Sequence, residues 1–159
     1  MRVFPLVFLR TVLVGVVCAM MVPFLVHADA GLVVTPAVVD QKAGARDILK
    51  ETVSLTNTTD HSMFLYPSVV NVDSIDGEQA FSVPTDSSQR ATSLANWIEL
   101  SRGVIEVGPG ETKNVPYVIR VNLNAVPGVY HAQISFGNGS TRDEAEAQPL
   151  ATMMVNLEI

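Results

Sequence analysis

The segment Leu150–Ile159, LATMMVNLEI, decides the fold class of this 159-residue chain, and Thr112–Val121, TKNVPYVIRV, repeats its pattern. In both segments apolar residues recur at every second position, and largely polar residues lie between them. Gly128–Phe136, GVYHAQISF, alternates in the same way. A period of two is typical of a β-strand with one buried face and one solvated face. These segments therefore predict an all-β protein.

Four further extended segments lie upstream of these three, bounded by turn-forming Gly, Pro, Asn or Asp residues. They are Leu32–Val39, Ile48–Thr56, Ser62–Val72 and Gln79–Val83. Short strands separated by turns are typical of an antiparallel sandwich. We therefore expect an immunoglobulin-like antiparallel β-sandwich of about seven strands over residues 31–159. No segment after residue 30 has a helical pattern over three turns, although Ala91–Ile98 has room for a short helical turn.

Prolines and polar clusters mark where the predicted strands bend or end. Pro36 predicts an edge position or a kink in the first strand. Apolar residues on both faces of the third strand fit a central strand, or one that changes its buried face at Pro67. Asp76-Gly77 is typical of a hairpin turn. Gln41–Asp47 is predicted as a polar turn and Asn138–Gln148 as a loop or hairpin tip.

The first thirty residues have the three-part pattern of a secretory signal peptide. Arg2 and Arg10 give a basic start, Thr11–Val26 is apolar, and small residues allow cleavage after Ala28. The apolar run has 16 residues, fewer than the ~20 that span a bilayer, which favours a signal peptide at residues 1–28 over an uncleaved hydrophobic anchor helix. The mature chain is expected outside the cytoplasm, as a secreted, periplasmic or cell-surface protein. A membrane would be contacted only through an uncleaved leader or an anchor after Ile159.

The chain is acidic, and more so without its leader. It has ten Lys and Arg residues against sixteen Asp and Glu residues, and two of the basic residues lie in the leader, which leaves a net charge of −8. A nucleic-acid partner needs a basic surface that neutralises phosphates, so nucleic acid is not expected as a partner. The single cysteine, Cys18, also lies in the leader, so the mature domain is expected to fold without a disulfide.

No catalytic group is predicted. The mature chain has two histidines: His61 follows Asp60 in a turn, and His131 lies on the polar side of its strand. A nucleophilic triad needs a histidine oriented beside a serine, and the Gly-x-Ser-x-Gly motif is absent from the sequence. We therefore expect a protein that is not an enzyme and uses no cofactor.

Two acidic clusters are candidates for a metal site. They comprise Asp73, Asp76 and Glu78 in one cluster and Asp143, Glu144 and Glu146 in the other. Calcium favours such oxygen ligands, but the spacing of the first cluster differs from that of a calcium-binding loop. Both clusters are predicted to be solvated surface groups, with no metal ligand among them.

Trp97 is the one candidate for ligand contact. Along an extended segment it lies on the face opposite Leu94 and Ile98. Packing between the sheets is the favoured interpretation, because tryptophan is highly buried on average. The alternative is an exposed stacking platform for a sugar ring.

Two asparagines, Asn57 and Asn138, begin the Asn-x-Ser/Thr pattern of N-glycosylation acceptors. The pattern is short and occurs often by chance. Whether either site is used depends on the host, so the sequence leaves both open.

Four motifs follow one another in a recognisable order. They are Thr56-Asn57, Asn96-Trp97-Ile98-Glu99-Leu100, Ile105–Glu111 leading into Val115–Ile119, and Val126-Pro127-Gly128-Val129-Tyr130. This order resembles the immunoglobulin-like domains of bacterial cell-surface proteins, and in particular the peptidoglycan-binding-like domain of WxL-interacting proteins. The resemblance covers Leu32 to Ile159 and implies a protein or cell-wall glycan partner at the bacterial cell surface.

Val34-Thr35-Pro36 and Phe81-Ser82-Val83-Pro84 more distantly resemble the N-terminal domain of periplasmic pilus chaperones of the PapD type. This resemblance implies that a basic pair in a cleft and an edge strand cap a pilin subunit. Lys113 and Arg120 are basic residues of one predicted strand, but the pattern around them differs from that of the family.

From these features we expect a non-enzymatic extracytoplasmic binding or structural module of the bacterial cell surface, acting in adhesion, as a scaffold or in cell-wall binding. Strand addition at an exposed sheet edge is the expected mechanism. The alternative is a periplasmic chaperone of the pilus-assembly type that acts by strand addition. A third option is a sugar-binding module built around Trp97.

Overall fold

The computed structural model describes residues 31–75, 78–84 and 90–159. The signal peptide predicted at residues 1–28, the hairpin turn predicted at Asp76-Gly77 and residues 85–89 lie outside the described residues. Within the described part of the chain, no helix has the length and apolar character needed to cross a membrane.

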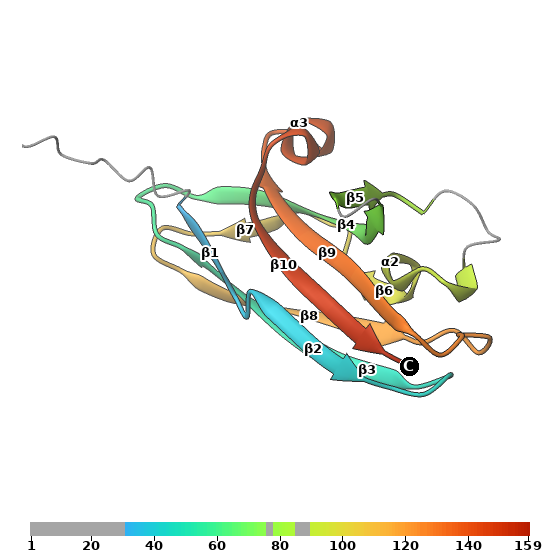
Figure 1. Ribbon diagram of the computed structural model, residues 1–159. Coiled ribbons are helices and arrows are strands. Elements are labelled where there is room, and N and C mark those ends of the chain that lie inside the picture. Colours follow the sequence, from blue (N-terminus) through green and yellow to red (C-terminus); the bar gives the residue numbers. More distant parts are fainter. Residues whose placement is uncertain (1–30, 76–77, 85–89) are drawn as a thin grey trace, which may run out of the picture.

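Two β-sheets pack face to face and enclose the core (Figure 1). Sheet A has the order β1–β3–β8–β6 and consists of β1 (Leu32–Thr35), β3 (Ile48–Asn57), β8 (Thr112–Arg120) and β6 (Ile98–Leu100). Sheet B has the order β2–β10–β9–β4–β5 and consists of β2 (Val38–Lys42), β10 (Pro149–Glu158), β9 (Val129–Asn138), β4 (Met63–Ile75) and β5 (Glu78–Ser82), with β7 (Ile105–Val107) also paired to β4. Two short helices are α2 (Leu94–Trp97) and α3 (Arg142–Ala147). The predicted all-β sandwich is confirmed.

The three segments with the clearest alternation form the long strands β8, β9 and β10. Their alternating apolar side chains are buried: Val115, Tyr117 and Ile119 in β8, Ala132, Ile134 and Phe136 in β9, and Met153, Val155 and Leu157 in β10. These side chains come from both sheets and belong to one core cluster. The period of two therefore correctly identified the faces that meet between the sheets.

The described residues form ten strands rather than about seven, because one predicted strand divides in two and a segment that was not predicted as a strand contributes both β6 and β7. The predicted strand Leu32–Val39 divides at the Thr35–Pro36 peptide. The pairing of β1 with β3 ends there. The next strand, β2, pairs with β10 and extends into the predicted turn Gln41–Asp47. The chain crosses between the sheets without reversing and meets β10 in parallel, so the prediction of wholly antiparallel pairing is wrong at β2. The other segment contains β6, which pairs with β8, and β7, which pairs with β4.

The predicted loop Asn138–Gln148 contains the helix α3. Thr141 caps this helix, since its hydroxyl accepts a hydrogen bond from the N–H of Glu144. The helix lies directly on β9 at Gly137, where a Cβ atom would collide with the carbonyl oxygen of Ala145. Six helical residues are too few to produce a helical period, which is why the sequence predicted a loop.

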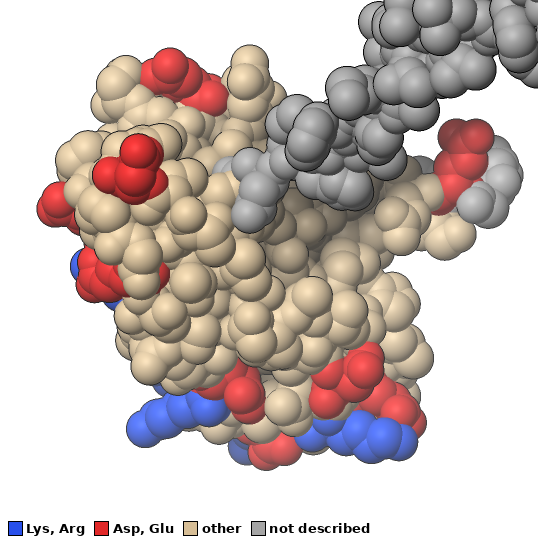
Figure 2. All heavy atoms as spheres, turned by 90° about the vertical axis from the view of Figure 1, so that its left-hand side faces the viewer, with Lys and Arg blue, Asp and Glu red and all other residues tan. Residues whose placement is uncertain are grey.

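The charged side chains are dispersed over the surface. On the face shown in Figure 2, Asp and Glu side chains occur on every side, whereas Lys and Arg side chains gather mostly at the lower edge, beside acidic ones. Neither sign forms a continuous patch across this face, which fits the modest net charge of −6 for the whole chain.

Tyr117 brings an unpaired polar group into the core. The residue is 1% exposed, and its hydroxyl has no hydrogen-bond partner among the described residues. Burial, with a smaller contribution from the negative charge of Glu51, raises the pKa of Tyr117 to about 12.

We expect Tyr117→Phe to raise the free energy of unfolding by about 1 kcal/mol at neutral pH, because it removes a hydroxyl that loses hydration without gaining a hydrogen bond. The unchanged chain should also lose stability as the pH rises from 10 towards about 12, since the unfolded state releases the phenol proton first. The Tyr117→Phe variant should not show the loss of stability that comes from this phenol. Urea unfolding of both chains at neutral pH and near pH 11 measures the difference, and a less stable variant at neutral pH would contradict the unpaired hydroxyl.

Candidate functional site

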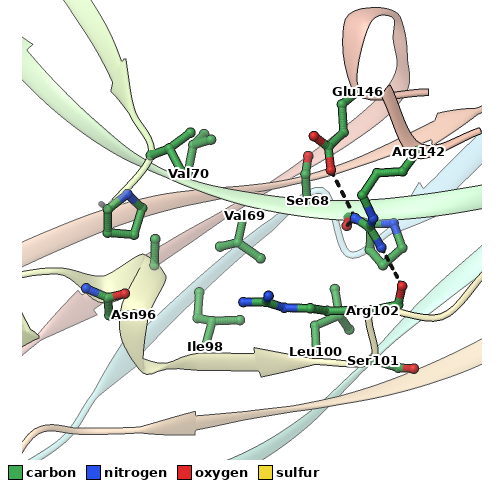
Figure 3. Close-up of a pocket in the computed structure, with 14 residues that line it drawn as sticks. Ser68, Val69, Val70, Asn96, Ile98, Leu100, Ser101, Arg102, Arg142 and Glu146 are labelled. Atoms are coloured by element: carbon green, nitrogen blue, oxygen red, sulfur yellow. Dashed lines mark hydrogen bonds and ion pairs between the residues drawn. The ribbon is translucent and has the colours of Figure 1, made fainter. Parts of the chain in front are cut away.

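A cleft of about 470 Å³ opens between the two sheets beside β6 (Figure 3). Its lining includes the apolar side chains of Val69 in β4 and of Ile98 and Leu100 in β6. Asn96 of α2 lies towards one end, and Arg142 of α3 lies towards the other. The volume falls within the range of pockets that hold ligands in proteins.

One wall of the cleft is a gap in the pairing of β4. On the side of β4 that faces away from β9, β7 pairs with Met63–Leu65 and β5 pairs with Asn71–Ile75. Residues 66–70 have no neighbouring strand on that side among the described residues. Six residue steps separate Leu65 from Asn71, so the gap is about 20 Å long.

Val69 directs its backbone hydrogen-bonding groups into this gap. Successive strand residues point their peptide groups alternately to the two sides. Phe64 points towards β9, where its N–H donates to Asn138 Oδ1 at 2.9 Å. Pro67 points the other way, and its carbonyl oxygen accepts from Arg142 Nη1 at 3.0 Å beside the cleft. Val69 follows Pro67 by two residues, so its N–H and C=O also face the cleft, where no described strand pairs with them.

The opposite wall is the free edge of sheet A. The N–H of Ile98 donates to the carbonyl oxygen of Leu94 in α2 and not to β8. Ile98 and Leu100 therefore direct their peptide groups away from β8. The helix α2 is held against β4, because Asn71 Oδ1 accepts from the N–H of Ala95 at 2.9 Å. Among the described residues, no strand thus pairs with the cleft-facing edge of β4 at Val69 or with that of β6.

Arg142 is held in place at the α3 end of the cleft. Its guanidinium donates to the carbonyl oxygens of Pro67 and Arg102, pairs with Glu146 at 2.9 Å and lies 5.6 Å from the ring centroid of Tyr66. These contacts connect α3, β4 and the chain after β6. Arg142 therefore fixes the shape of the cleft, and Glu146 balances its charge.

Arg102 lies in the crossing segment between β6 and β7. Its side chain is exposed and extends into the cleft (Figure 3). No ion pair and no side-chain hydrogen bond joins it to another residue in the part of the chain that the structure describes. Within the described residues, its charge is therefore not balanced by an ion pair.

Trp97, the predicted candidate for ligand contact, lies in the core at 2% exposure. Its ring packs against Tyr130 with the centroids 4.9 Å apart, and its indole N–H donates to the carbonyl oxygen of Arg90 at 2.6 Å. Along an extended segment Leu94 would lie on the face opposite Trp97. Leu94–Trp97 instead forms α2, where residues three apart share one face, so both side chains are buried. The ring offers no free face to a sugar.

Neither histidine lies in the cleft. His61 is exposed, and its Nδ1 lies 3.2 Å from a carboxylate oxygen of Asp60, which lowers the pKa of Asp60. His131 is exposed on β9, with its Nδ1 2.7 Å from Asn156 Oδ1. Among the described residues no serine hydroxyl is bonded to either ring, so the fold does not assemble a nucleophile and a base there.

The cleft lining also lacks Lys113 and Arg120, the two basic residues named above in the resemblance to PapD-type chaperones. Lys113 Nζ donates to the carbonyl oxygen of Glu106 at 2.7 Å, and Arg120 Nε pairs with Glu99 at 2.7 Å. The two residues are close to opposite ends of β8 and do not act as a pair.

The acidic clusters do not assemble into a metal site within the described ranges. In the first cluster Asp76 lies outside the described residues, and Asp73 and Glu78 are exposed. In the second cluster Glu144 accepts hydrogen bonds from the N–H and hydroxyl of Ser140, which lower its pKa. These carboxylates are therefore engaged locally or solvated.

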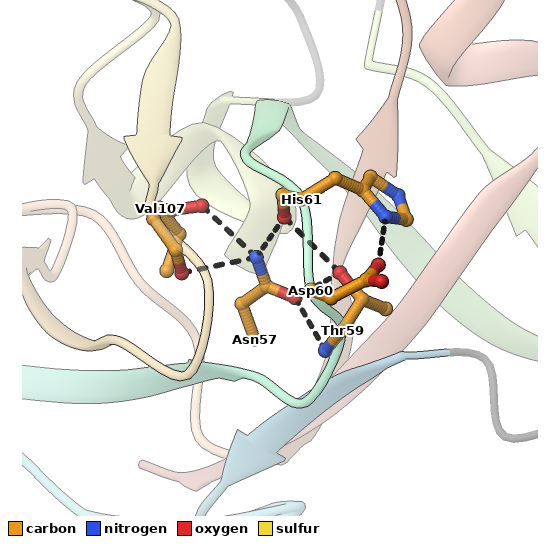
Figure 4. A network of polar contacts seen from close by, with 6 residues as sticks. Asn57, Thr59, Asp60, His61 and Val107 are labelled. Carbon is orange, nitrogen blue, oxygen red and sulfur yellow. Dashed lines mark hydrogen bonds and ion pairs between the residues drawn. The ribbon is translucent and has the colours of Figure 1, made fainter.

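Asn57, one of the two sequon asparagines, is fully buried, and its side chain forms hydrogen bonds with several chain segments (Figure 4). Its Nδ2 lies 2.7 Å from the carbonyl oxygen of His61 and 3.1 and 3.0 Å from two carbonyl oxygens at the end of β7. Its Oδ1 accepts from the N–H and the hydroxyl of Thr59. These bonds join the end of β3, the turn before β4 and the end of β7. Asn138, the other sequon asparagine, is exposed.

We expect Asn57→Ala to lower the free energy of unfolding by about 3 kcal/mol, because it leaves several buried carbonyl groups without a donor. Asn124 is exposed and provides the matched control, so Asn124→Ala should change stability by less than about 0.5 kcal/mol. Urea unfolding of both variants gives the comparison. Equal stabilities would contradict the structural role of Asn57.

No pattern in the sequence predicts the cleft or the residues that shape it. Pro67 carried one signal, since a proline inside a strand lacks an N–H and is found where the strand is unpaired. Arg102 lies in a crossing segment and Arg142 in a six-residue helix, where no period or motif marks them.

No protein-family model matches the chain, and no curated protein matches it in sequence. Solved structures do match. The PapD-like domain 7 of human CEP192 has a TM-score of 0.53 at 7% identity, covering 82% of this chain and 85% of that one. A chain of the CsuC–CsuE chaperone–tip adhesion subunit complex from Csu pili of Acinetobacter baumannii has a TM-score of 0.53 at 13% identity, covering 80% of this chain and 56% of that one.

A family 123 glycoside hydrolase from Clostridium perfringens has a TM-score of 0.54 at 12% identity, covering 77% of this chain and 22% of that one. The chain thus spans about a fifth of the hydrolase and just over half of the chain from the pilus complex. At these identities the likeness concerns the fold alone. It supports the resemblance to PapD-type domains: this chain folds as an immunoglobulin-like sandwich similar to PapD-like domains.

Proposed function

We propose that this chain is a non-enzymatic extracytoplasmic module that binds an extended segment of a partner protein in the cleft between β4 and β6. The partner segment adds to the open run of β4, between β7 and β5, and lays its side chains on the apolar lining. Recognition of this kind draws affinity from main-chain hydrogen bonds and specificity from pockets for alternate side chains.

The observation that carries this proposal is the orientation of Val69. Its N–H and C=O face a cleft in which no described strand pairs with them, while residues on both sides of the gap are paired. Backbone groups left in this state bind water or another chain, and a strand of a partner satisfies them with matched geometry. The gap of about 20 Å accommodates roughly five or six extended residues.

The composition of the cleft favours a protein over the other partners considered. Its described lining contains no aromatic ring on which a sugar would stack, so a cell-wall glycan is the weaker candidate. It also contains no histidine and no cysteine, and its one carboxylate, Glu146, is paired with Arg142. The absence of a reactive group in this lining supports a binding role. The proposal that the chain is exported rests on the signal peptide predicted at residues 1–28.

A periplasmic assembly chaperone is the second candidate within this proposal, because the fold is shared with a chain of a chaperone–tip adhesion subunit complex. A chaperone would bind subunits that lack a strand, whereas an adhesin or scaffold would bind an extended tail of a folded surface protein. Both would use the same open edge.

We expect a bound peptide to slow the hydrogen exchange of the Val69 amide at least about tenfold, because the peptide shields a group that faces the cleft in the free chain. Peptides of seven residues selected from a displayed library provide the ligands, and nuclear magnetic resonance measures exchange. Val69→Pro removes the N–H and should abolish binding, whereas Val69→Ala keeps it and should bind. Selected peptides that leave the exchange of Val69 unchanged would contradict the proposal, whether or not the proline variant folds.

A further inference from the structure

The charges that line the cleft do not cancel. The charged lining residues are Arg102, Arg142 and Glu146, which give a net charge of +1 in a chain whose overall net charge is −6. Glu146 forms an ion pair with Arg142 at 2.9 Å. The acidic residue of neighbouring β6, Glu99, forms an ion pair with Arg120 at 2.7 Å. The cleft is therefore locally positive on an acidic protein.

Among the described residues that line the cleft, the charge without an ion-pair partner is that of Arg102. Its backbone is held, since its carbonyl oxygen accepts a hydrogen bond from the Arg142 guanidinium. Its side chain has no partner in the described ranges and extends from the end of β6 towards Ile98 and Val69 (Figure 3). A guanidinium presents a planar fork of N–H donors that matches the two oxygens of a carboxylate. An apolar lining beneath it lowers the local dielectric and strengthens such a pair.

We propose that the segment bound in the cleft carries an Asp or Glu side chain that pairs with Arg102, with aliphatic residues two positions away on either side. The spacing follows from strand geometry, because residues i and i+2 of an extended segment point to the same face. The acidic residue then meets Arg102 while its second neighbours rest on Val69, Ile98 and Leu100. This inference rests on the proposed function, since it names the partner chemistry of the same cleft.

Three peptides that differ at one position test the charge preference. They are acetyl-Thr-Val-Thr-Glu-Thr-Val-Thr-amide and its versions with Gln or Lys in the central position, whose blocked ends exclude a terminal carboxylate. We expect the Glu peptide to bind about tenfold more tightly than the Gln peptide, because a hydrogen bond to a charged group contributes more than one between neutral groups. The Lys peptide should bind more weakly still. The preference for Glu should shrink as salt rises, since the pair is partly exposed.

Variants of the full chain assign the preference to one residue. Arg102→Gln should reduce the ratio between the Glu and Gln peptides to less than about twofold, and Arg102→Lys should retain only part of it. Lys50 is an exposed basic residue outside the cleft lining, so Lys50→Gln controls for net charge and should leave the ratio unchanged. Isothermal titration calorimetry gives the affinities.

The outcomes separate the two proposals. Equal binding of all three peptides, with slowed exchange at Val69, would overturn the role of Arg102 and leave strand addition standing. A Glu preference that survives Arg102→Gln would also overturn it. Failure of all three peptides to bind would count against both the charge preference and the cleft as a strand-binding site.

Discussion

Two chain segments leave sheet A for sheet B before they end, and this constraint shapes the whole molecule. β1 passes into β2 at one side of the sandwich, and β6 passes into β7 at the other. A strand that changes sheets closes the side of the sandwich and adds pairing to both layers. It also leaves unpaired the stretch of sheet B that lies opposite the crossing, because each backbone group has only one partner at a time. Each crossing therefore creates a gap in a hydrogen-bonding ladder.

The two gaps differ in how they are protected. At β10, strand β2 pairs only with Met154–Glu158, so no described strand pairs with the earlier part of β10 on that side. There Pro149 has no N–H to offer, and a register shift at residues 149–151 disturbs the edge, two features that natural proteins use to block unwanted pairing. At β4 the proline is Pro67, and Arg142 caps its carbonyl oxygen. No described strand pairs with Val69 on the side of the cleft, so this gap is the one where we propose ligand binding.

The position of β7 depends on Asn57, a residue outside the cleft lining. By bonding to two carbonyl oxygens at the end of β7, Asn57 fixes where the crossing segment rejoins sheet B. The start of the same segment is fixed by the bond from Arg142 to Arg102. A buried amide at one end and a guanidinium at the other thus determine the course of the chain that carries Arg102.

The alternation of apolar residues was sufficient to predict the class of fold and the buried faces of β8, β9 and β10, because a period of two reports directly which side chains meet in the core. It was not sufficient to predict the crossings. β6 and β7 have three residues each, too few for a period, and a strand that changes sheets keeps its local pattern while changing its partner. The same limit hid the cleft, which depends on which backbone groups lack a neighbour. The face of Trp97 was predicted wrongly for a related reason. Along a strand Leu94 and Trp97 would lie on opposite faces, but the four-residue helix puts both on the same face.

The two arginines of the cleft illustrate how one residue type takes two roles according to its surroundings. Arg142 makes an ion pair, two backbone hydrogen bonds and an aromatic contact, so moving it towards a ligand would break several interactions at once. Arg102 has none of these side-chain contacts within the described ranges, and its side chain can turn towards a ligand while its backbone stays fixed. Binding at Arg102 therefore requires little reorganisation of the protein, which keeps the cost of ordering low. Arg142 shapes the cleft, and Arg102, whose side chain has no partner among the described residues, is the one we propose to select the ligand by charge.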